Sequence, residues 1–301
     1  MNSNNWFFIY HDISEEGWST PKGFAFALEN EGINLFKFRF SNPKNFSLPE
    51  NEFFIENNIK IVVSFYAGEC LTLERELIRL KNDLGVFIIC ELGDEPQTLI
   101  NNSTRASISD ISLSPDHRSS LYWKNQNYNC IWFTHWADTI IYKHDSNCKK
   151  NIFIGTSMGW RKYNLLLKIL FGKSYINKKC NPSENAQLYQ KSKIVFQYAR
   201  WNEITRRLFE AAACKCCILT NRLPEHTHLE TIFAHNVSAI YYDNFFSLIY
   251  QLIRLILKPN LHKTIAKNAY EIVINHHTQI SRAKELIRLV NLKNNIKDCN
   301  N

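Results

Sequence analysis

The chain has 301 residues, of which 45% are hydrophobic, and its formal net charge is +8. This length suffices for two medium domains or one large domain. It contains no run of about 18 apolar residues, so we expect no membrane span. The start, MNSNNWFFIYHD, lacks the basic stretch and long apolar core of a signal peptide. Most of the nine cysteines lie in apolar runs, which favours buried thiols in the reducing cytoplasm over a disulfide framework.

Strand-like and helix-like segments alternate through the first half. Thr20 and Pro21 fit the cap and first position of a helix that Gly32 ends. Alternating or continuous apolar runs predict the strands between the helices. We expect helices at 20–31 and 71–83, and strands at 6–12, 34–40, 60–66, 86–92, 108–114 and 130–135.

The second half repeats this alternation. We expect strands at 150–155, 194–199, 216–221 and 238–243, and helices at 158–171, 184–192, 202–214, 244–257, 260–275 and 278–291. Such alternation predicts mainly parallel sheets with helices on both faces. We therefore predict an α/β chain with two doubly wound Rossmann-like domains that face a cleft, because ligands of such sheets bind beyond the carboxyl ends of the strands. The domains expected are 1–147, 148–277, and a C-terminal helix and tail, 278–301, that packs back on the first.

Charge is divided unevenly between the halves. Residues 1–147 carry −7 and residues 148–301 carry +15. Three interpretations stay open: attraction between the halves, binding of an anionic ligand such as a diphosphate, or peripheral contact with an anionic membrane. The aromatic residues Trp6, Phe7 and Phe8, taken as exposed, are compatible with the membrane. Nucleic acid is disfavoured because no basic-aromatic repeat or reader motif occurs.

A glycine-containing turn follows the strand at 150–155. Gly155 and the segment up to Arg161 lead into a helix, whose N-terminal amide groups suit phosphate. Arg161 would add a charge-assisted contact. The segment has neither the dinucleotide G-x-G-x-x-G spacing nor the P-loop G-K-[ST], so the pattern alone favours a small-residue turn without phosphate.

The stretch WNEITRRLFEAAACKCC, residues 201–217, carries the most information. As a helix it would place Glu203, Arg207 and Glu210 on one face. That face is either an exposed salt-bridged stripe of little energetic value or a carboxylate and cation aimed at a ribose and phosphate. The C-x-C-C run at 214–217 has no second Cys or His pair at zinc-site spacing, so we favour a helix end over a metal site.

The order of these segments resembles a known family. LYQKSKIVFQYA, then RLFEAAAC (207–214), CCILTN, Leu223-Pro224-Glu225, SAIYYD and His277-Thr278 with Arg282 resemble the C-terminal domain of GT-B glycosyltransferases of the spore-maturation-protein type. The first half, through Asp94-Glu95-Pro96, SDISLSPD (109–116) and THWAD (134–138), resembles the acceptor domain of the same family less sharply.

The resemblance implies roles for particular residues. Glu210 takes the position that holds the donor ribose, and the backbone amides of Ile204 and Thr205 lie near the diphosphate. Asn202 stands at the position of the family's first acidic residue, with Glu203 one place off. Lys215 stands where the family has glycine.

The implied reaction moves a sugar from a nucleotide-diphosphate-sugar donor to an unidentified hydroxyl acceptor. The family predicts retained configuration, no metal and no cofactor besides the donor, in glycan or surface-polysaccharide synthesis. Arg161, Arg206 and Arg207 would stabilise the leaving diphosphate. His11 and Asp94, at strand ends, are candidate bases, although a histidine at a strand end or a helix cap explains them equally.

Two other functions stay open. Asn202 and Lys215 depart from the family motif, so a non-catalytic nucleotide-sugar-binding subunit that supports a partner enzyme is the alternative. A doubly wound nicotinamide dehydrogenase is disfavoured because neither half carries the dinucleotide fingerprint.

Overall fold

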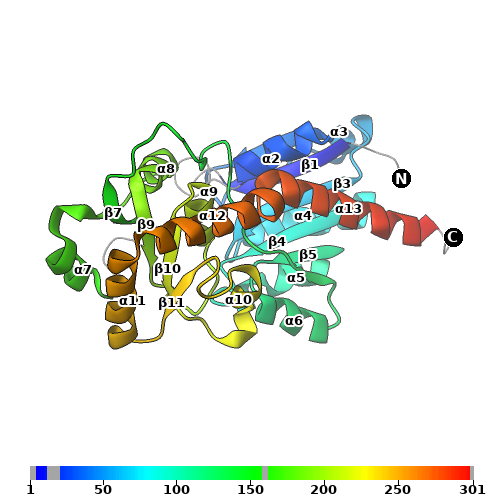
Figure 1. Cartoon of the computed structure of the whole chain (residues 1–301). Helices are drawn as coiled ribbons and strands as arrows, with labels where there is room; N and C mark the ends of the chain where they lie inside the picture. The colour runs from blue at the N-terminus through cyan, green and yellow to red at the C-terminus, as the bar shows by residue number, and fades with distance from the viewer. Residues whose placement is uncertain (1–4, 12–20, 158–161, 299–301) are drawn as a thin grey trace. The chain divides into compact units, whose positions relative to one another are not determined.

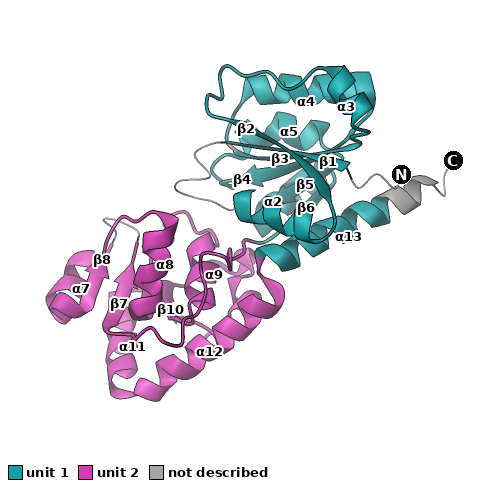
Figure 2. Cartoon of the chain, turned by 90° about the horizontal axis from the view of Figure 1, so that it is seen from above, with its two compact units in different colours: residues 1–134, 279–301 teal, residues 135–278 magenta. Residues whose placement is uncertain are grey.

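The computed structural model describes residues 5–11, 21–157 and 162–298. The chain forms two compact units: residues 1–134 with 279–301, and residues 135–278 (Figure 2). The first boundary lies between residues 134 and 135, before the one expected after residue 147. Within the described residues, no helix is both long and apolar enough to span a bilayer.

Unit 1 is built on a six-stranded parallel sheet with the order β2-β1-β3-β4-β5-β6. Helices cover it (Figure 1). The strands are β1 (Asn5–His11), β2 (Asn34–Phe40), β3 (Ile61–Ala67), β4 (Phe87–Gly93), β5 (Ile111–Ser114) and β6 (Cys130–Trp132). The helices are α2 (Pro21–Asn30), α3 (Asn51–Glu56), α4 (Leu71–Leu84), α5 (Ser103–Ile108), α6 (His117–Asn125) and α13 (Gln279–Asp298), with a 3₁₀ turn, η1 (Ile100–Asn102).

Strand β1, which lies between β2 and β3, is buried on both faces. Phe7 packs on one side with Phe54, and Phe8 on the other with Phe24 and Phe65. This is why the strand reads as a continuous apolar run. Trp6, Phe7 and Phe8 are at most 2% exposed. The expectation that these three side chains are exposed is wrong, since they belong to the core of the sheet.

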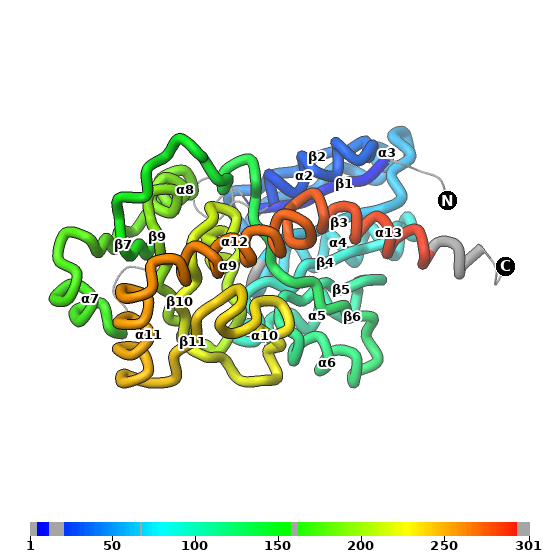
Figure 3. The backbone as a smooth tube through the Cα atoms, in the orientation of Figure 1, coloured from blue at the N-terminus to red at the C-terminus, as the bar shows by residue number. Residues whose placement is uncertain are grey.

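Helix α13 returns to unit 1 as expected and packs on α2 (Figure 3). It buries Ala283, Leu286 and Val290 completely or almost completely. At its outer edge, Lys284 lies 3.6 Å from Glu31, which follows α2.

Unit 2 has a five-stranded parallel sheet with the order β11-β10-β9-β7-β8. The strands are β7 (Ile152–Thr156), β8 (Tyr175–Asn177), β9 (Ser192–Gln197), β10 (Cys217–Asn221) and β11 (Ile240–Tyr242). The helices are α7 (Asn164–Phe171), α8 (Pro182–Lys191), α9 (Arg206–Ala213), α10 (Leu229–Ile232), α11 (Phe245–Leu257) and α12 (Pro259–His276), with 3₁₀ turns η2 (Gly172–Ser174) and η3 (Glu225–Thr227).

One helix of unit 2 begins later than predicted. Helix α9 begins at Arg206 instead of residue 202, because Asn202 has a left-handed φ of 51° and the residues after it form a loop. The carbonyl of Thr205 starts the helix, accepting from the Leu208 amide at 3.2 Å. Glu203 therefore precedes the helix, and the predicted stripe of Glu203, Arg207 and Glu210 on one helix face is wrong.

Candidate functional site

The carboxyl edge of the unit 2 sheet carries a loop that connects β9 to α9. The side chain of Asn221, at the end of β10, holds this loop: its Oδ1 accepts from the Ala199 amide at 2.8 Å and its Nδ2 donates to the Ala199 carbonyl at 3.3 Å. The Tyr242 hydroxyl donates to the Gln197 carbonyl at 3.0 Å. The loop encloses a small hollow of about 80 Å³, lined by Gln197, Tyr198, Ala199, Arg200, Trp201, Glu203, Thr205 and Arg207.

The N-terminus of α9 opens at this hollow. Thr205 is its N-cap, but the Thr205 hydroxyl caps no amide and instead accepts from Gln197 Nε2. The Thr205 side chain therefore caps none of the first amide groups of the helix. With the helix dipole and the two arginines of the first turn, Arg206 and Arg207, they make this end electropositive. Such an arrangement suits an anion.

Glu210 lies one turn further along α9 and is only 8% exposed. Asn185 Nδ2, from α8, donates to Glu210 Oε2 at 3.3 Å and also to the Tyr142 hydroxyl at 3.2 Å. Burial raises the pKa of Glu210, while the charges of Arg206 and Arg207 and a hydrogen bond with Tyr142 act in the opposite direction. Glu210 is thus a buried carboxyl group beside two cations, not part of an exposed stripe.

Two tyrosines complete the surroundings of Glu210. The Tyr189 hydroxyl, from α8, lies 3.1 Å from Ser157 Oγ at the end of β7. Burial, followed by the Glu210 charge, raises the pKa of both Tyr142 and Tyr189. Sequence reasoning missed Tyr142, Asn185 and Tyr189. Asn185 and Tyr189 lie four residues apart on α8, but Tyr142 belongs to a separate segment, and no spacing in the sequence links these residues to Glu210.

Buried oxygen atoms lie along the same edge. Thr156 Oγ1 and Gln197 Oε1, at the ends of β7 and β9, and Asn185 Oδ1 have no hydrogen-bond partner within the described part of the chain. A buried polar atom without a partner costs about 1–3 kcal/mol. These atoms therefore mark the edge between β7, α8 and β9 as a place where a polar ligand gains by binding.

The other predicted donor residues fall in different places. Ile204 is buried in the loop before α9, and Asn202 is exposed. Gly155 lies in β7, which ends one residue later than predicted, at Thr156. A Cβ atom there would lie 2.1 Å from Ser192 Oγ, which explains the glycine by close packing. Arg161 lies outside the described residues.

The two predicted bases end strands of unit 1. His11 is the last residue of β1, with its ring 5.2 Å from that of Phe40 and 5.7 Å from that of Tyr66. Asp94 follows β4 directly and is exposed. Since β3 lies between β1 and β4, the two strands are about 10 Å apart, and their ends place both residues at one edge of the sheet.

The next residue, Glu95, has a different environment. It is buried and accepts hydrogen bonds from Asn102, Ser114 and Trp123. Burial raises its pKa, and these hydrogen bonds act in the opposite direction. Glu95 is therefore satisfied within the fold of unit 1.

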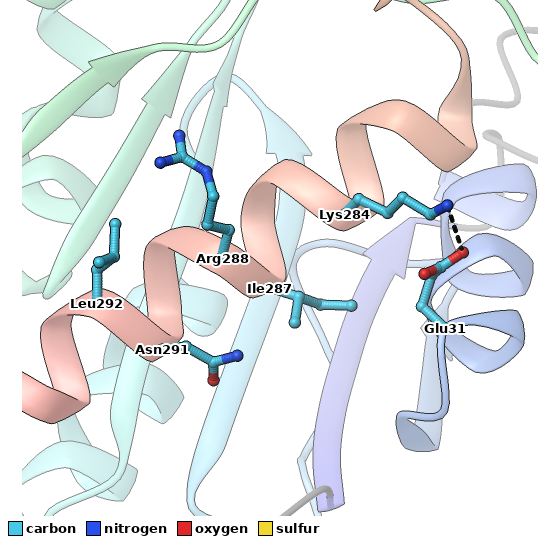
Figure 4. Close-up of a pocket in the computed structure, with 6 residues that line it drawn as sticks. All are labelled: Glu31, Lys284, Ile287, Arg288, Asn291 and Leu292. Carbon is cyan, nitrogen blue, oxygen red and sulfur yellow. Dashed lines mark ion pairs between the residues drawn. The ribbon is translucent and has the colours of Figure 1, made fainter.

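A wider hollow in unit 1 lies elsewhere. It measures about 350 Å³ and is lined by Glu31, Lys284, Ile287, Arg288, Asn291 and Leu292 (Figure 4). Glu31 stands between the end of α2 and the start of β2, which places the hollow by the amino ends of the strands. Ligand sites of open α/β sheets lie at the opposite, carboxyl ends. The hollow marks the seam where α13 packs on α2.

Comparison with known proteins decides the family. The glycosyl transferase-like family matches residues 137–288, which is just over half of the chain. The chain belongs to this family. It is a glycosyltransferase, and it carries the two parallel α/β sheets of the GT-B fold. No curated protein matches its sequence.

Solved structures support the same fold. The sucrose-phosphate synthase of Thermosynechococcus elongatus matches with a TM-score of 0.66 at 9% identity, covering 95% of this chain and 98% of that one. A glycosyltransferase from Rickettsia africae matches with a TM-score of 0.65 at 11% identity, covering 96% and 98%. Anabaena HepE in complex with UDP matches with a TM-score of 0.63 at 11% identity, covering 95% and 99%.

Proposed function

We propose that this glycosyltransferase uses a nucleotide-diphosphate-sugar donor and binds its nucleotide where β9 leads into α9. The observation that carries the proposal is Glu210: a buried carboxyl group one turn after the doubly cationic start of a helix. A ribose presents two neighbouring hydroxyl donors, and a diphosphate presents anionic oxygens. The start of α9 offers an acceptor for the first and donors for the second.

Different groups of the site bind different parts of the donor. In the proposal, Glu210 accepts from the ribose hydroxyls. The first amide groups of α9, with Arg206 and Arg207, receive the diphosphate. As the bond to the sugar breaks, negative charge builds on the leaving diphosphate, and donors already in place stabilise it. The resemblance to GT-B enzymes supports transfer without a metal ion and with retained configuration.

UDP is the first nucleotide to test. Two proteins of related fold bind UDP or a UDP-sugar in solved structures: Anabaena HepE, in complex with UDP and with UDP-glucose, and the pneumococcal O-GlcNAc transferase GtfA, in complex with UDP and GlcNAc. A hydroxyl acceptor in cytoplasmic glycan or surface-polysaccharide synthesis completes the proposal. His11 and Asp94 are the proposed bases, because both stand at the carboxyl edge of the unit 1 sheet.

The test is release of UDP from a panel of UDP-sugars. A glycosyltransferase without its acceptor hydrolyses its donor slowly, so the full chain should release UDP from one member of the panel. Glu210→Gln should lower that rate at subsaturating donor. A thermal-shift screen of the panel finds the donor first, because a ligand that binds only the folded state stabilises it. Binding of a donor without release of UDP would contradict the catalytic proposal.

A non-catalytic nucleotide-sugar-binding subunit is the second candidate. The observation that favours it is Asn202, which is neutral and exposed where the family motif has an acid. Glu203, one residue on, lines the hollow and supplies a carboxylate there. Glu203→Gln separates the candidates. In an enzyme, this variant should release UDP more slowly than the unaltered chain does. In a non-catalytic subunit, the unaltered chain and the variant should both bind the donor and release no UDP.

A further inference from the structure

Helix α11 of unit 2 exposes an apolar stripe. Phe246, Tyr250, Ile253 and Leu257 follow one another at helical spacing and are between 50% and 80% exposed. The opposite side of the helix is already used, since Leu248, Leu252 and Leu255 are buried in the core of unit 2. The exposed stripe is therefore a second apolar side that the fold of unit 2 does not require.

Helix α7 adds a neighbouring apolar surface. Leu165, Ile169 and Leu170 are between 52% and 71% exposed. Leu167 joins the same buried cluster as Leu248 of α11, so both helices pack on one face of the sheet. The Tyr163 ring, just before α7, lies 6.2 Å from the Phe245 ring at the start of α11. Figures 1 and 2 agree in placing the two helices at the same end of unit 2.

The charged residues near these apolar side chains in the sequence are cations, apart from Asp243, which precedes α11 and pairs with Arg222 at 2.9 Å. Residues 146–183 and 244–270 contain no Asp or Glu. Lys168, Lys173 and Lys258 are exposed in or directly after the two helices. Within the described residues, none of these three lysines forms an ion pair. The surface is therefore apolar and positive at once.

We propose that this α7–α11 face docks on an anionic lipid bilayer. The face consists of Leu165, Ile169, Leu170, Phe246, Tyr250, Ile253 and Leu257, with Lys168, Lys173 and Lys258. A helix with an apolar face and adjacent cations lies in the plane of the headgroups, where the apolar side chains enter the boundary with the acyl chains and the cations meet anionic headgroups.

The positive charge of the α7–α11 face favours an anionic bilayer over a second copy of the chain as its partner. In a symmetric dimer through this face, the lysines of both copies would be brought together, and juxtaposed like charges oppose association. An anionic bilayer supplies the opposite charge and a medium for the apolar stripe. Such docking would hold the enzyme beside membrane-bound acceptors, but it does not depend on the identity of the donor.

The experiment is co-sedimentation of the full chain with vesicles. Vesicles of phosphatidylcholine with 30% phosphatidylglycerol should bind the protein at least tenfold more tightly than vesicles of phosphatidylcholine alone, and added salt should weaken the binding by screening the lysines. The double variant Phe246→Glu, Leu257→Glu should lose at least tenfold in binding. The matched control, Ile55→Glu with Ile100→Glu, changes residues that are 63% and 83% exposed in unit 1 and should bind as the unaltered protein does.

Both double variants should keep the circular dichroism spectrum of the unaltered protein, because all four side chains are exposed. No binding of the unaltered protein to the anionic vesicles would overturn the proposal. Equal loss in the two double variants would also overturn it, as would a dimer in sedimentation velocity that only the α11 variant dissociates.

Discussion

Lys215 shows how one residue departs from its family and still closes the helix. Its φ is 56°, in the left-handed region where glycine is favoured. The Cys216 amide donates to the Ala211 carbonyl at 3.0 Å and the Lys215 amide to the Ala212 carbonyl at 2.8 Å, which is the Schellman pattern. The motif therefore forms without glycine, at a local cost of about 1 kcal/mol.

We predict that Lys215→Gly stabilises the protein by about 1 kcal/mol, because glycine adopts this φ without a steric penalty. Urea unfolding measures the change. Lys215→Ala is the control: it keeps the left-handed φ and loses the contact of Lys215 Nζ with the Tyr270 ring at 5.6 Å, so it should lower stability by about 0.5 kcal/mol. Equal stability of the two variants would show that φ is not what limits this helix end.

A substitution of Arg207 tests the proposed contact of the site with the diphosphate. It lines the hollow at the start of α9. We predict that Arg207→Ala weakens binding of UDP by about 1.5–3 kcal/mol, the range for a hydrogen bond to a charged group, and leaves binding of uridine almost unchanged. Calorimetry with both ligands provides the comparison. Lys193→Ala removes a cation from the start of β9, at the other edge of the sheet, and should change neither affinity. An equal loss of affinity for UDP and for uridine would show that Arg207 does not contact the phosphates.

At the scale of elements, helix α13 follows unit 2 in sequence but belongs to unit 1. Its apolar side packs on α2, with Leu286 fully buried. We predict that Leu286→Ala destabilises unit 1 by about 2–4 kcal/mol, through lost burial and the cavity that remains. Hydrogen exchange of the β1 and β2 amides measures this. Leu292 lies on the same helix and is 48% exposed, so Leu292→Ala should change the free energy of unfolding obtained from hydrogen exchange by less than about 0.5 kcal/mol.

The elements that patterns predicted well are those with strong periodicity or an apolar core. Strand β1 and helix α4 lie within a residue or so of the predicted ranges. Helices α3 and α5, six residues each, and strand β8, of three, are too short to show a period, and they were missed. The start of α9 was misplaced because nothing before Arg206 breaks a helix by composition, whereas Asn202 adopts a left-handed φ in the folded chain.

At the scale of the whole molecule, two parallel sheets, whose strands were predicted except for β8, and a family match over residues 137–288 agree with the fold predicted from the sequence. The candidate site could be predicted only in part. Glu210 and Arg207 came from a contiguous motif, and the structure brings both to the start of α9. Tyr142, Asn185 and Tyr189 approach Glu210 only through the tertiary fold, so no local pattern could identify them.

The most direct test of the donor site is the affinity of UDP for the unaltered chain and for Glu210→Gln, measured by calorimetry. The amide keeps the volume of the buried side chain and removes its charge. Loss of a charge-assisted contact to the ribose should weaken the binding of UDP by about 1.5–3 kcal/mol. Glu271→Gln, which changes an exposed α12 residue 3.7 Å from Lys267, should bind UDP as the unaltered chain does. Unchanged UDP affinity in a folded Glu210→Gln protein would contradict the assignment of this edge of unit 2 as the donor site.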